Sequence, residues 1–379
     1  MTHSDIARIE VSAYRVPIST PVMTSFGAMT NRPAVFVRLT DADGAFGWGE
    51  IFANWPAAGA EHRARLLMED IADLVIGFRA EAASDLFGHL MARTHIRALQ
   101  CGEWGPFAQV IAGLDTAMHD LFARRQGVSL ARHLNRDAAA SVPAYASGIH
   151  IAAAATIVPE VRELGYLAKK VKIGFDAETD LAQLAALCAD RRDGERIFTD
   201  ANQAWDLGQA LAFVDAAQGF DLGWLEEPIR ADMPGDQWAE LAKASGIPLA
   251  AGENITGFDS FDAAIGSGTF RFIQPDVAKW GGVTGCYRIG QAIVGGGKTY
   301  CPHFLGGGIG LIASGHLLAA AGGDGLLEVD INANPLRDAF FDGGMCRDGV
   351  FAIADAPGLG FETLPDSLAR YRTLELSRS

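Results

Sequence analysis

Residues 196–228 read RIFTDANQAWDLGQALAFVDAAQGFDLGWLEEP, and this stretch contains the structural unit that the chain repeats. It begins with a β-like run at 196–202, continues with an amphipathic run at 206–218, and ends with a second β-like run at 222–228. Asp206 precedes the amphipathic run at the position where a carboxylate caps a helix. The stretch therefore predicts a strand, a helix and a second strand.

The same unit recurs along the following sequence. Eight β-like runs are present: Val142–Ser147, Ala168–Gly174, Arg196–Asn202, Leu222–Pro228, Pro248–Asn254, Phe270–Val277, Lys298–His303 and Leu326–Asp330. Seven of them end in a charged or imidazole side chain: Lys172, Asp200, Glu226, Glu253, Asp276, His303 and Glu328. The intervals are 28, 26, 27, 23, 27 and 25 residues, about the length of one strand, one helix and two loops. This spacing predicts an α/β fold, a (β/α)7β TIM-type barrel, whose polar groups meet at the carboxyl ends of the strands.

The first part of the chain lacks this repeat of strand and helix. Runs at 9–16, 34–39 and 45–50 alternate as antiparallel strands, and helical patterns follow near 61–76, 80–96 and 106–126. We therefore expect an α+β domain at residues 1–127. A tail at about 355–379 is expected to complete it, and a barrel at 128–354 to carry the metal and catalytic residues.

The composition narrows the class of partner. With 46 acidic and 31 basic residues the net charge is −15, which argues against a nucleic-acid partner. Five widely spaced cysteines without a CxxC pair argue against a disulfide framework or a zinc knuckle. No apolar run is long enough to span a bilayer, so we expect a soluble, cytoplasmic protein that binds a small molecule.

Three acids point to a metal site. Asp200, Glu226 and Glu253 end three consecutive predicted strands, which are neighbours in a barrel. Three oxygen ligands without cysteine or histidine favour Mg²⁺. A single acid after a strand is more often a solvated loop residue. Three acids at the same position relative to their strands favour a shared metal site. Glu227 follows Glu226 directly, and strand alternation should point it away from the ion.

Two lysines are predicted to enter the barrel mouth. Lys170 and Lys172 lie on one face of a strand whose other face carries Val171 and Ile173. Like charge, partial burial and a nearby cation would lower the pKa of Lys172, which could then act as a base. Lys170 would stay charged and bind a substrate carboxylate.

A histidine provides a second acid/base group. His303 ends the seventh run and Asp276 the sixth, so Asp276 could hydrogen-bond the imidazole, fix its tautomer and raise its basicity. Glu328, at the end of the last run, could share a proton with a developing oxyanion if its pKa is raised. A base, an opposed acid and a metal suit abstraction of a proton next to a carboxylate.

The ordered motifs resemble the enolase superfamily, specifically its mandelate racemase subgroup. They are Gly47-Trp48-Gly49-Glu50, Lys170-Val171-Lys172, Asp200-Ala201-Asn202, Glu226-Glu227-Pro228, Gly252-Glu253-Asn254, Gln274-Pro275-Asp276 and Pro302-His303. The resemblance implies Mg²⁺ at Asp200, Glu226 and Glu253. It also implies that Lys172 and the His303–Asp276 dyad are the acid/base groups, and that Lys170, Asn202 and Glu328 contact the substrate. The first domain is then expected to cap the barrel, with loops near 20–31 and 51–59 closing over the substrate.

A second resemblance concerns the reaction. The run Glu328-Val329-Asp330, the run Asn334-Pro335-Leu336-Arg337 and the segment Pro357-Gly358-Leu359-Gly360 are similar to galactarolactone cycloisomerase and sugar-acid dehydratases. We expect dehydration of an acid sugar by a homo-oligomer. Racemisation, epimerisation and lactone cycloisomerisation remain open on the same residues, as does a barrel that binds metal and sugar acid without turnover.

Two further expectations concern the pocket walls. Phe26, Trp55 and Trp104 could pack on an apolar group or a sugar face, although Trp104 could equally be core. The glycine-rich run Gly306–Gly310 is expected to let the backbone approach a ligand after the seventh strand.

Overall fold

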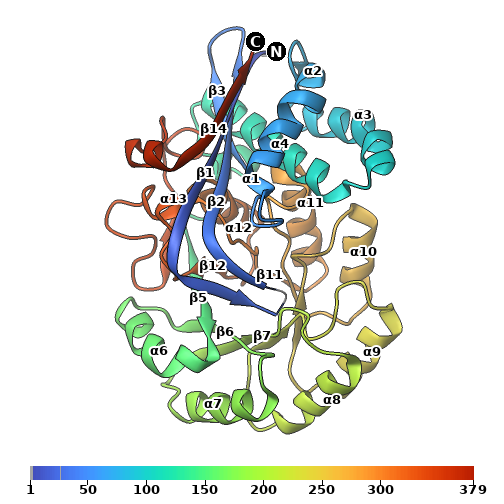
Figure 1. The fold of residues 1–379 in the computed structure, drawn as a ribbon, viewed down its shortest axis with the longest axis vertical. Coiled ribbons are helices and arrows are strands. Elements are labelled where there is room, and N and C mark those ends of the chain that lie inside the picture. Colours follow the sequence, from blue (N-terminus) through green and yellow to red (C-terminus); the bar gives the residue numbers. More distant parts are fainter. Residues whose placement is uncertain (1–2, 26) are drawn as a thin grey trace.

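The structure, a computed structural model that describes residues 3–25 and 27–379, is built around a curled parallel sheet (Figure 1). Its strands are β5 (Ser141–His150), β6 (Ala168–Lys172), β7 (Arg196–Asp200), β8 (Trp224–Glu226), β9 (Leu249–Ala251), β10 (Phe272–Ile273), β11 (Thr299–Tyr300) and β12 (Leu327–Asp330). The order in the sheet is β11-β10-β9-β8-β7-β6-β5-β12, and all of these pairs are parallel. All eight predicted strands are present, most of them shorter than the runs suggested.

A barrel helix follows each of the first seven strands. These helices are α6 (Ala154–Glu163), α7 (Ala177–Ala189), α8 (Leu207–Ala216), α9 (Gly235–Ala244), α10 (Phe258–Gly266), α11 (Gly282–Gly295) and α12 (Gly308–Ala321). Asp206 caps α8 as expected, since its carboxylate accepts a hydrogen bond from the Gln209 N–H. The (β/α)7β barrel is therefore confirmed.

The barrel closes by a close approach of β11 and β12. No ladder between these two strands is found within residues 3–25 and 27–379. Instead the Leu326 N–H donates to Cys301 Sγ at 3.4 Å. A Cβ on Gly325 would lie 1.8 Å from the Tyr300 carbonyl oxygen, so only glycine fits at this seam. Below the rim, the rings of Phe198 and Trp224 stack at 3.6 Å and fill the interior.

A second, antiparallel sheet forms the capping domain. Its order is β14 (Arg372–Arg378), β1 (Ser4–Thr24), β2 (Gly27–Asp41) and β3 (Phe46–Ile51), and a short β4 (Arg79–Ala80) also pairs with β1. Figure 1 shows the long β1–β2 hairpin extending from this sheet toward the ends of β6 and β7, with β14 alongside β1. The predicted domain boundaries remain predictions.

The helices of the capping domain cover this sheet. They are α1 (Gly59–Leu66), α2 (Ala72–Val75), α3 (Asp85–Cys101) and α4 (Trp104–Gln126), with a π-helical turn at Leu67–Ile71. Gly47 and Gly49 let α4 lie directly on β3, since a Cβ on them would come within 2.1 Å of Ala117 O and 2.0 Å of Gly113 O respectively. This contact places Glu50, the next residue of β3, toward the barrel.

The remaining elements connect or flank the two sheets. They are α5 (Leu130–Leu134), α13 (Pro335–Asp338), β13 (Val350–Ala352), and 3₁₀ turns at Ile151–Ala153 and Asp366–Tyr371. All five cysteines are free. Among the described residues, none of the helices has the length and apolar character needed to cross a membrane.

Candidate active site

The strand register brings the predicted site residues to one rim. Lys172 is in register with Asp200, and Asp200 is in register with Glu226. Because the strands are parallel, their carboxyl ends open on the same side of the barrel. The side chains that were separated by many residues in the sequence therefore meet.

Lys170 is buried at the centre of a charged network. Its Nζ lies 2.7 Å from Glu226 Oε1, 2.8 Å from Glu328 Oε1 and 3.7 Å from Asp200 Oδ2. Burial lowers the pKa of Lys170, but the Glu226 and Glu328 carboxylates outweigh it and hold the pKa well above its ordinary value. Lys170 is therefore charged, as expected.

Lys172 lies nearer to the cavity. Its Nζ donates to Asp200 Oδ2 at 2.9 Å and to Asn202 Oδ1 at 2.6 Å. Burial lowers the pKa of Lys172, but the adjacent Asp200 carboxylate raises it above the ordinary value overall. The expectation of a lowered pKa is thus wrong for this structure, because the attraction of Asp200 exceeds the repulsion by Lys170.

His303 is held between two carboxylates. The expected contact with Asp276 is present, since His303 Nδ1 lies 2.7 Å from Asp276 Oδ2. On its other side, Nε2 lies 2.8 Å from Glu253 Oε2. Burial lowers the pKa of His303, but Glu253, Glu328 and the Asp276 hydrogen bond raise it well above the ordinary value. These partners orient the imidazole and favour its protonated form.

Glu328 differs from the sequence expectation. Burial raises the pKa of Glu328, but the Lys170 and His303 charges lower it below the ordinary value overall. Its carboxylate also accepts hydrogen bonds from Ser147 Oγ and the Phe304 N–H. Glu328 is thus ionised and fixes Lys170, and the raised pKa needed for proton sharing is not found.

The three predicted metal ligands each face a cation. Asp200 pairs with Lys172, Glu226 with Lys170, and Glu253 with His303. In the part of the chain that the structure describes, no group of three or more His, Cys, Asp or Glu side chains has a metal-binding arrangement.

The electrostatics of the three acids nevertheless suit a divalent cation. Burial raises the pKa of Glu226 to about 7, with repulsion by Asp200 adding to it against the attraction of Lys170. Glu253 likewise repels Asp200. A hard cation among these oxygen donors would relieve that repulsion, so the donor set fits Mg²⁺.

Glu227 does not point away from the site. Its backbone is left-handed, with φ at 39°, which ends the strand alternation on which the expectation rested. The carboxylate is buried and accepts from Asn254 Nδ2 at 2.9 Å, while Asn254 Nδ2 also contacts Glu253 Oε1. Burial and repulsion by Glu253 raise the pKa of Glu227 well above its ordinary value. A fourth acid thus belongs to the cluster.

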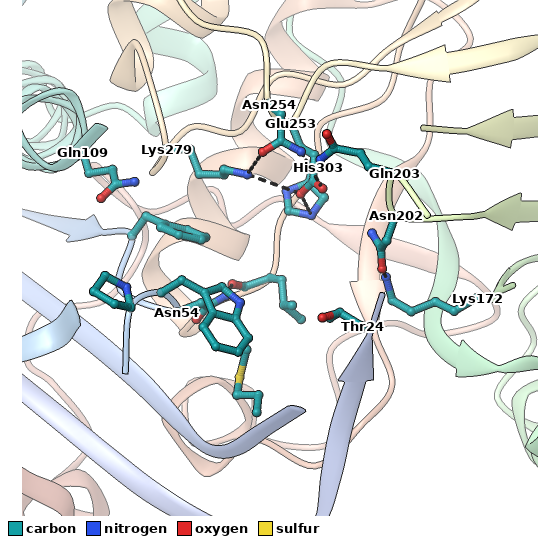
Figure 2. A pocket seen from close by; sticks show the side chains of 15 residues that line it. Thr24, Asn54, Gln109, Lys172, Asn202, Gln203, Glu253, Asn254, Lys279 and His303 are labelled. Carbon is teal, nitrogen blue, oxygen red and sulfur yellow. Dashed lines mark hydrogen bonds and ion pairs between the residues drawn. The ribbon is translucent and has the colours of Figure 1, made fainter. Parts of the chain in front are cut away.

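Five residues of this cluster line a cavity of about 580 Å³, namely Lys172, Asn202, Glu253, Asn254 and His303. Figure 2 shows Lys172 and Asn202 at one side of it, and His303, Glu253 and Asn254 nearer the other. Lys279 also lines the cavity, and its Nζ lies 2.9 Å from Asn254 Oδ1 and 3.5 Å from Glu253 Oε2. Lys279 was not predicted as a site residue, although it is one of only six lysines and lies three residues after Asp276.

The capping domain supplies the remaining walls. Thr24 and Met29 come from the β1–β2 hairpin, and the residues that follow β3 contribute Phe52, Asn54, Trp55 and Pro56. Both loops expected to close over the substrate therefore line the cavity. Trp55 is among the lining residues, whereas Trp104 is 47% exposed and packs on His95 away from it. Phe26 lies outside the described residues.

Comparison with known proteins identifies the family. Residues 7–134 match the mandelate racemase / muconate lactonizing enzyme N-terminal domain, and residues 150–367 match the enolase C-terminal domain-like model. D-galactarolactone cycloisomerase from Agrobacterium fabrum is 27% identical over 371 residues, which are 94% of this chain and 95% of that protein. The curated relatives also include dehydratases and epimerases.

Two solved structures are similar over almost the whole chain. A mandelate racemase/muconate lactonizing enzyme from Bordetella bronchiseptica RB50 has a TM-score of 0.91 and 42% identity, covering 98% of this chain and 100% of that one. L-talarate dehydratase from Polaromonas sp. JS666, complexed with Mg and L-glucarate, has a TM-score of 0.84 and 26% identity, covering 100% and 99%. The chain therefore belongs to the enzymes of the enolase superfamily, within the mandelate racemase/muconate lactonizing enzyme family.

Proposed function

We propose that this enzyme abstracts the α-proton of a sugar acid and expels the oxygen at the β-carbon, which is dehydration of an acid sugar. The observation that carries the proposal is that Lys172 and His303 line one cavity from different strands, while Lys170 is fixed beside it as a permanent cation. One group can take a proton while the other gives one.

The two acid/base groups have distinct tasks in this proposal. One of Lys172 and His303 removes the α-proton, and the other protonates the leaving β-oxygen. His303 is oriented by the hydrogen bond of its Nδ1 to Asp276, which leaves Nε2 as the atom that gives or takes a proton. Lys172 becomes a base only when the Asp200 charge beside it is neutralised, because Asp200 is what raises its pKa.

The substrate carboxylate needs a compensating charge as the α-proton leaves. We assign Lys170 and Asn202 to its binding, with Glu328 holding Lys170 in place. Asp200, Glu226 and Glu253 would hold Mg²⁺, which supplies Lewis-acid stabilisation of the doubly charged carboxylate.

Typical rate effects show that acid/base groups alone cannot account for catalysis, so the charges that bind the carboxylate must contribute. Positioned acid/base groups typically contribute about 10²–10⁴-fold, roughly 3–6 kcal/mol. Enzymes commonly lower barriers by roughly 8–23 kcal/mol. The remainder has to come from electrostatic stabilisation and from holding the substrate in position.

A second candidate is cycloisomerisation of a sugar lactone. The observation in its favour is the full-length similarity to D-galactarolactone cycloisomerase. The same two proton transfers would serve if the leaving β-oxygen were part of a ring, because the ring would then open without loss of water. Racemisation or epimerisation would instead return a proton to the opposite face of the α-carbon.

A substrate screen distinguishes these reactions. Mono- and diacid sugars and their lactones are incubated with the enzyme and Mg²⁺ in D₂O and followed by proton NMR. Dehydration of an open-chain acid and ring opening of a lactone both give a 2-keto acid, which semicarbazide converts to an absorbing semicarbazone, so the compound that reacts separates these two. Racemisation gives α-deuteration without a keto product. A barrel that only binds sugar acids would show neither signal with any compound, and that outcome would overturn the proposal.

We also propose the organisation expected from the sequence. The domains are residues 1–127 with about 355–379, and residues 128–354, and copies of the chain associate. Limited proteolysis followed by mass spectrometry tests the boundaries, and light scattering after size-exclusion chromatography tests the association.

A further inference from the structure

Glu50 is a buried carboxylate with no part in the chemistry proposed above. It lies on β3 of the capping domain, is 4% exposed, and is directed at the barrel segment that follows His303. Its Oε1 accepts from the Gly307 N–H at 2.5 Å, and its Oε2 accepts from the Gly310 N–H at 2.8 Å. These N–H groups belong to the start of α12, where a helix leaves its donors unpaired and favours negative charge.

The glycine-rich run fits closely around this carboxylate. A Cβ on Gly306 would lie 2.8 Å from Glu50 Oε1, and a Cβ on Gly307 would lie 2.9 Å from it. The backbone here thus approaches Glu50, whereas the sequence suggested a ligand. A Cβ on Gly306 would also come within 2.6 Å of the Phe304 ring, and one on Gly307 within 2.8 Å of the Phe36 ring, so a side chain at either position would require a neighbouring side chain or the segment itself to shift.

A second contact from the capping domain holds the same segment. Asn54 Nδ2 donates to the Leu305 carbonyl at 2.6 Å. Together with Glu50, it fixes the backbone on both sides of Gly306, between His303 and the first turn of α12. From the barrel, the Glu328 carboxylate accepts from the Phe304 N–H at 3.3 Å.

We propose that Glu50 is a positioning residue, which couples docking of the capping domain to the alignment of His303. It does not contact the cavity, so it acts through the backbone of residues 304–310. The inference rests on the proposed function, because it concerns the proton transfer assigned to His303. Lys172 has no such link to Glu50, since its partners Asp200 and Asn202 belong to the barrel.

Glu50→Gln tests this coupling with little change of shape. The amide would present its NH₂ group to one of two backbone N–H donors, so one hydrogen bond becomes a repulsive contact. Asp120→Asn is the matched control. Asp120 is a buried carboxylate that accepts from two backbone N–H groups, those of Trp48 and Leu359, but it does not contact the His303 segment.

Two readouts are needed. The first is hydrogen–deuterium exchange of the peptide containing residues 303–310, measured by mass spectrometry without substrate. The second is the ratio of α-proton exchange to product formation in D₂O, compared with the ratio in His303→Asn. Loss of an orienting partner typically costs about 10–100-fold, which is the expected fall in product formation.

We expect faster amide exchange at residues 303–310 in Glu50→Gln. We also expect its ratio of α-proton exchange to product formation to shift in the same direction as in His303→Asn. Asp120→Asn should show neither change. A wild-type ratio in Glu50→Gln, or unaltered amide exchange, would overturn the inference. If wild-type enzyme acts on no acid, the proposed function fails, and the amide exchange still decides whether Glu50 orders the segment.

A second variant covers the case in which Glu50→Gln does not fold. Asn54→Ala removes the other contact of the capping domain with this segment and leaves Glu50 in place. We expect a smaller shift of both readouts in the same direction. Unchanged readouts in Asn54→Ala would then contradict the coupling.

Discussion

The two sides of the cavity are held in different ways. On the lysine side, made of Lys170, Lys172, Asp200 and Asn202, charged barrel side chains satisfy one another, and the capping domain adds one contact, from Ser25 Oγ to the Asn202 carbonyl. On the histidine side, made of His303, Asp276, Glu253 and Lys279, the segment after His303 is also anchored by Glu50 and Asn54. The side-chain partners of Lys172 therefore come from the barrel, whereas the segment after His303 is held partly by the capping domain.

The difference assigns separate tasks to the two domains. A proton-transfer group that the barrel alone fixes is available whether or not the cap is docked. Under the proposed coupling, a group that the cap helps to fix is aligned when the cavity is covered, which would tie water exclusion to the proton transfer at His303.

The largest expected effect comes from removing either acid/base group. Lys172→Ala and His303→Asn should each lower product formation by roughly 10²–10⁴-fold, because proton transfer on one side is lost. Mg²⁺ binding should persist in both, measured by isothermal titration calorimetry. His95→Asn, at an exposed histidine of α3, is the control. Unaltered turnover in both site variants would refute the assigned roles.

A second test separates the two adjacent glutamates. Glu226 contacts Lys170 on the lysine side, and Glu227 contacts Asn254 beside the histidine side. Glu226→Gln should weaken Mg²⁺ binding by more than the roughly 10–100-fold typical of an outer partner, and Glu227→Gln by no more than that. Calorimetric titration with Mg²⁺ measures both. The reverse order of affinities would make Glu227 the ligand.

The third test uses the acid sensitivity of α12, the helix that begins at the segment after His303. His316 on α12 accepts a hydrogen bond from the Ala131 N–H, and burial lowers its pKa to about 4. Above pH 6.5 it is neutral in both folded and unfolded chains, so its contribution to stability is fully present. As the pH falls from 6.5 to 4, the unfolded chain binds the proton first, and up to about 3 kcal/mol of stability is lost.

Urea unfolding measured at several pH values checks this loss. The free energy of unfolding of wild-type protein should fall more steeply below pH 6.5 than that of His316→Asn, in which the titrating ring is absent. Other buried acids titrate in both proteins, so the difference between the two curves isolates His316. Parallel curves would show that the titration of His316 does not lower the free energy of unfolding in this pH range.

The smallest expected effect concerns Lys279. Its ammonium group faces the cavity beside Glu253 and Asn254, so it adds positive potential where an anionic substrate binds. Lys279→Met should raise KM by roughly tenfold, the lower end of what a hydrogen bond to a charged group contributes. The value of kcat should change less. Lys243→Met, at an exposed lysine of α9, is the control, and an equal KM in both variants would exclude a binding role for Lys279.

The sequence predicted the barrel well because its signal is periodic. A polar residue ends one strand after another at nearly constant intervals, and parallel strands leave all these residues on one rim. The capping helices were also predicted, since α4 carries a regular apolar stripe of residues such as Leu114 and Met118, both fully buried.

The features that were not predicted from the sequence depend on local backbone conformation and on contacts between distant parts of the chain. Glu227 joins the cluster because of a left-handed backbone that no alternation pattern reveals. The pKa of Lys172 is raised because Asp200 lies 2.9 Å away, closer than spacing alone can indicate. The role of Glu50 follows from a contact with Gly307, 257 residues along the chain.

The pairing of β14 with β1 has a consequence for biosynthesis. Ile9 is the partner of Arg378, so the edge of the capping sheet joins segments from opposite ends of the described chain. On the ribosome, β1 must wait with that edge unpaired until residues 372–378 emerge, by which time the whole barrel has been translated. Contacts this far apart close slowly, and an unpaired edge strand invites association with other chains. The nascent chain thus carries this unpaired edge through almost all of its translation.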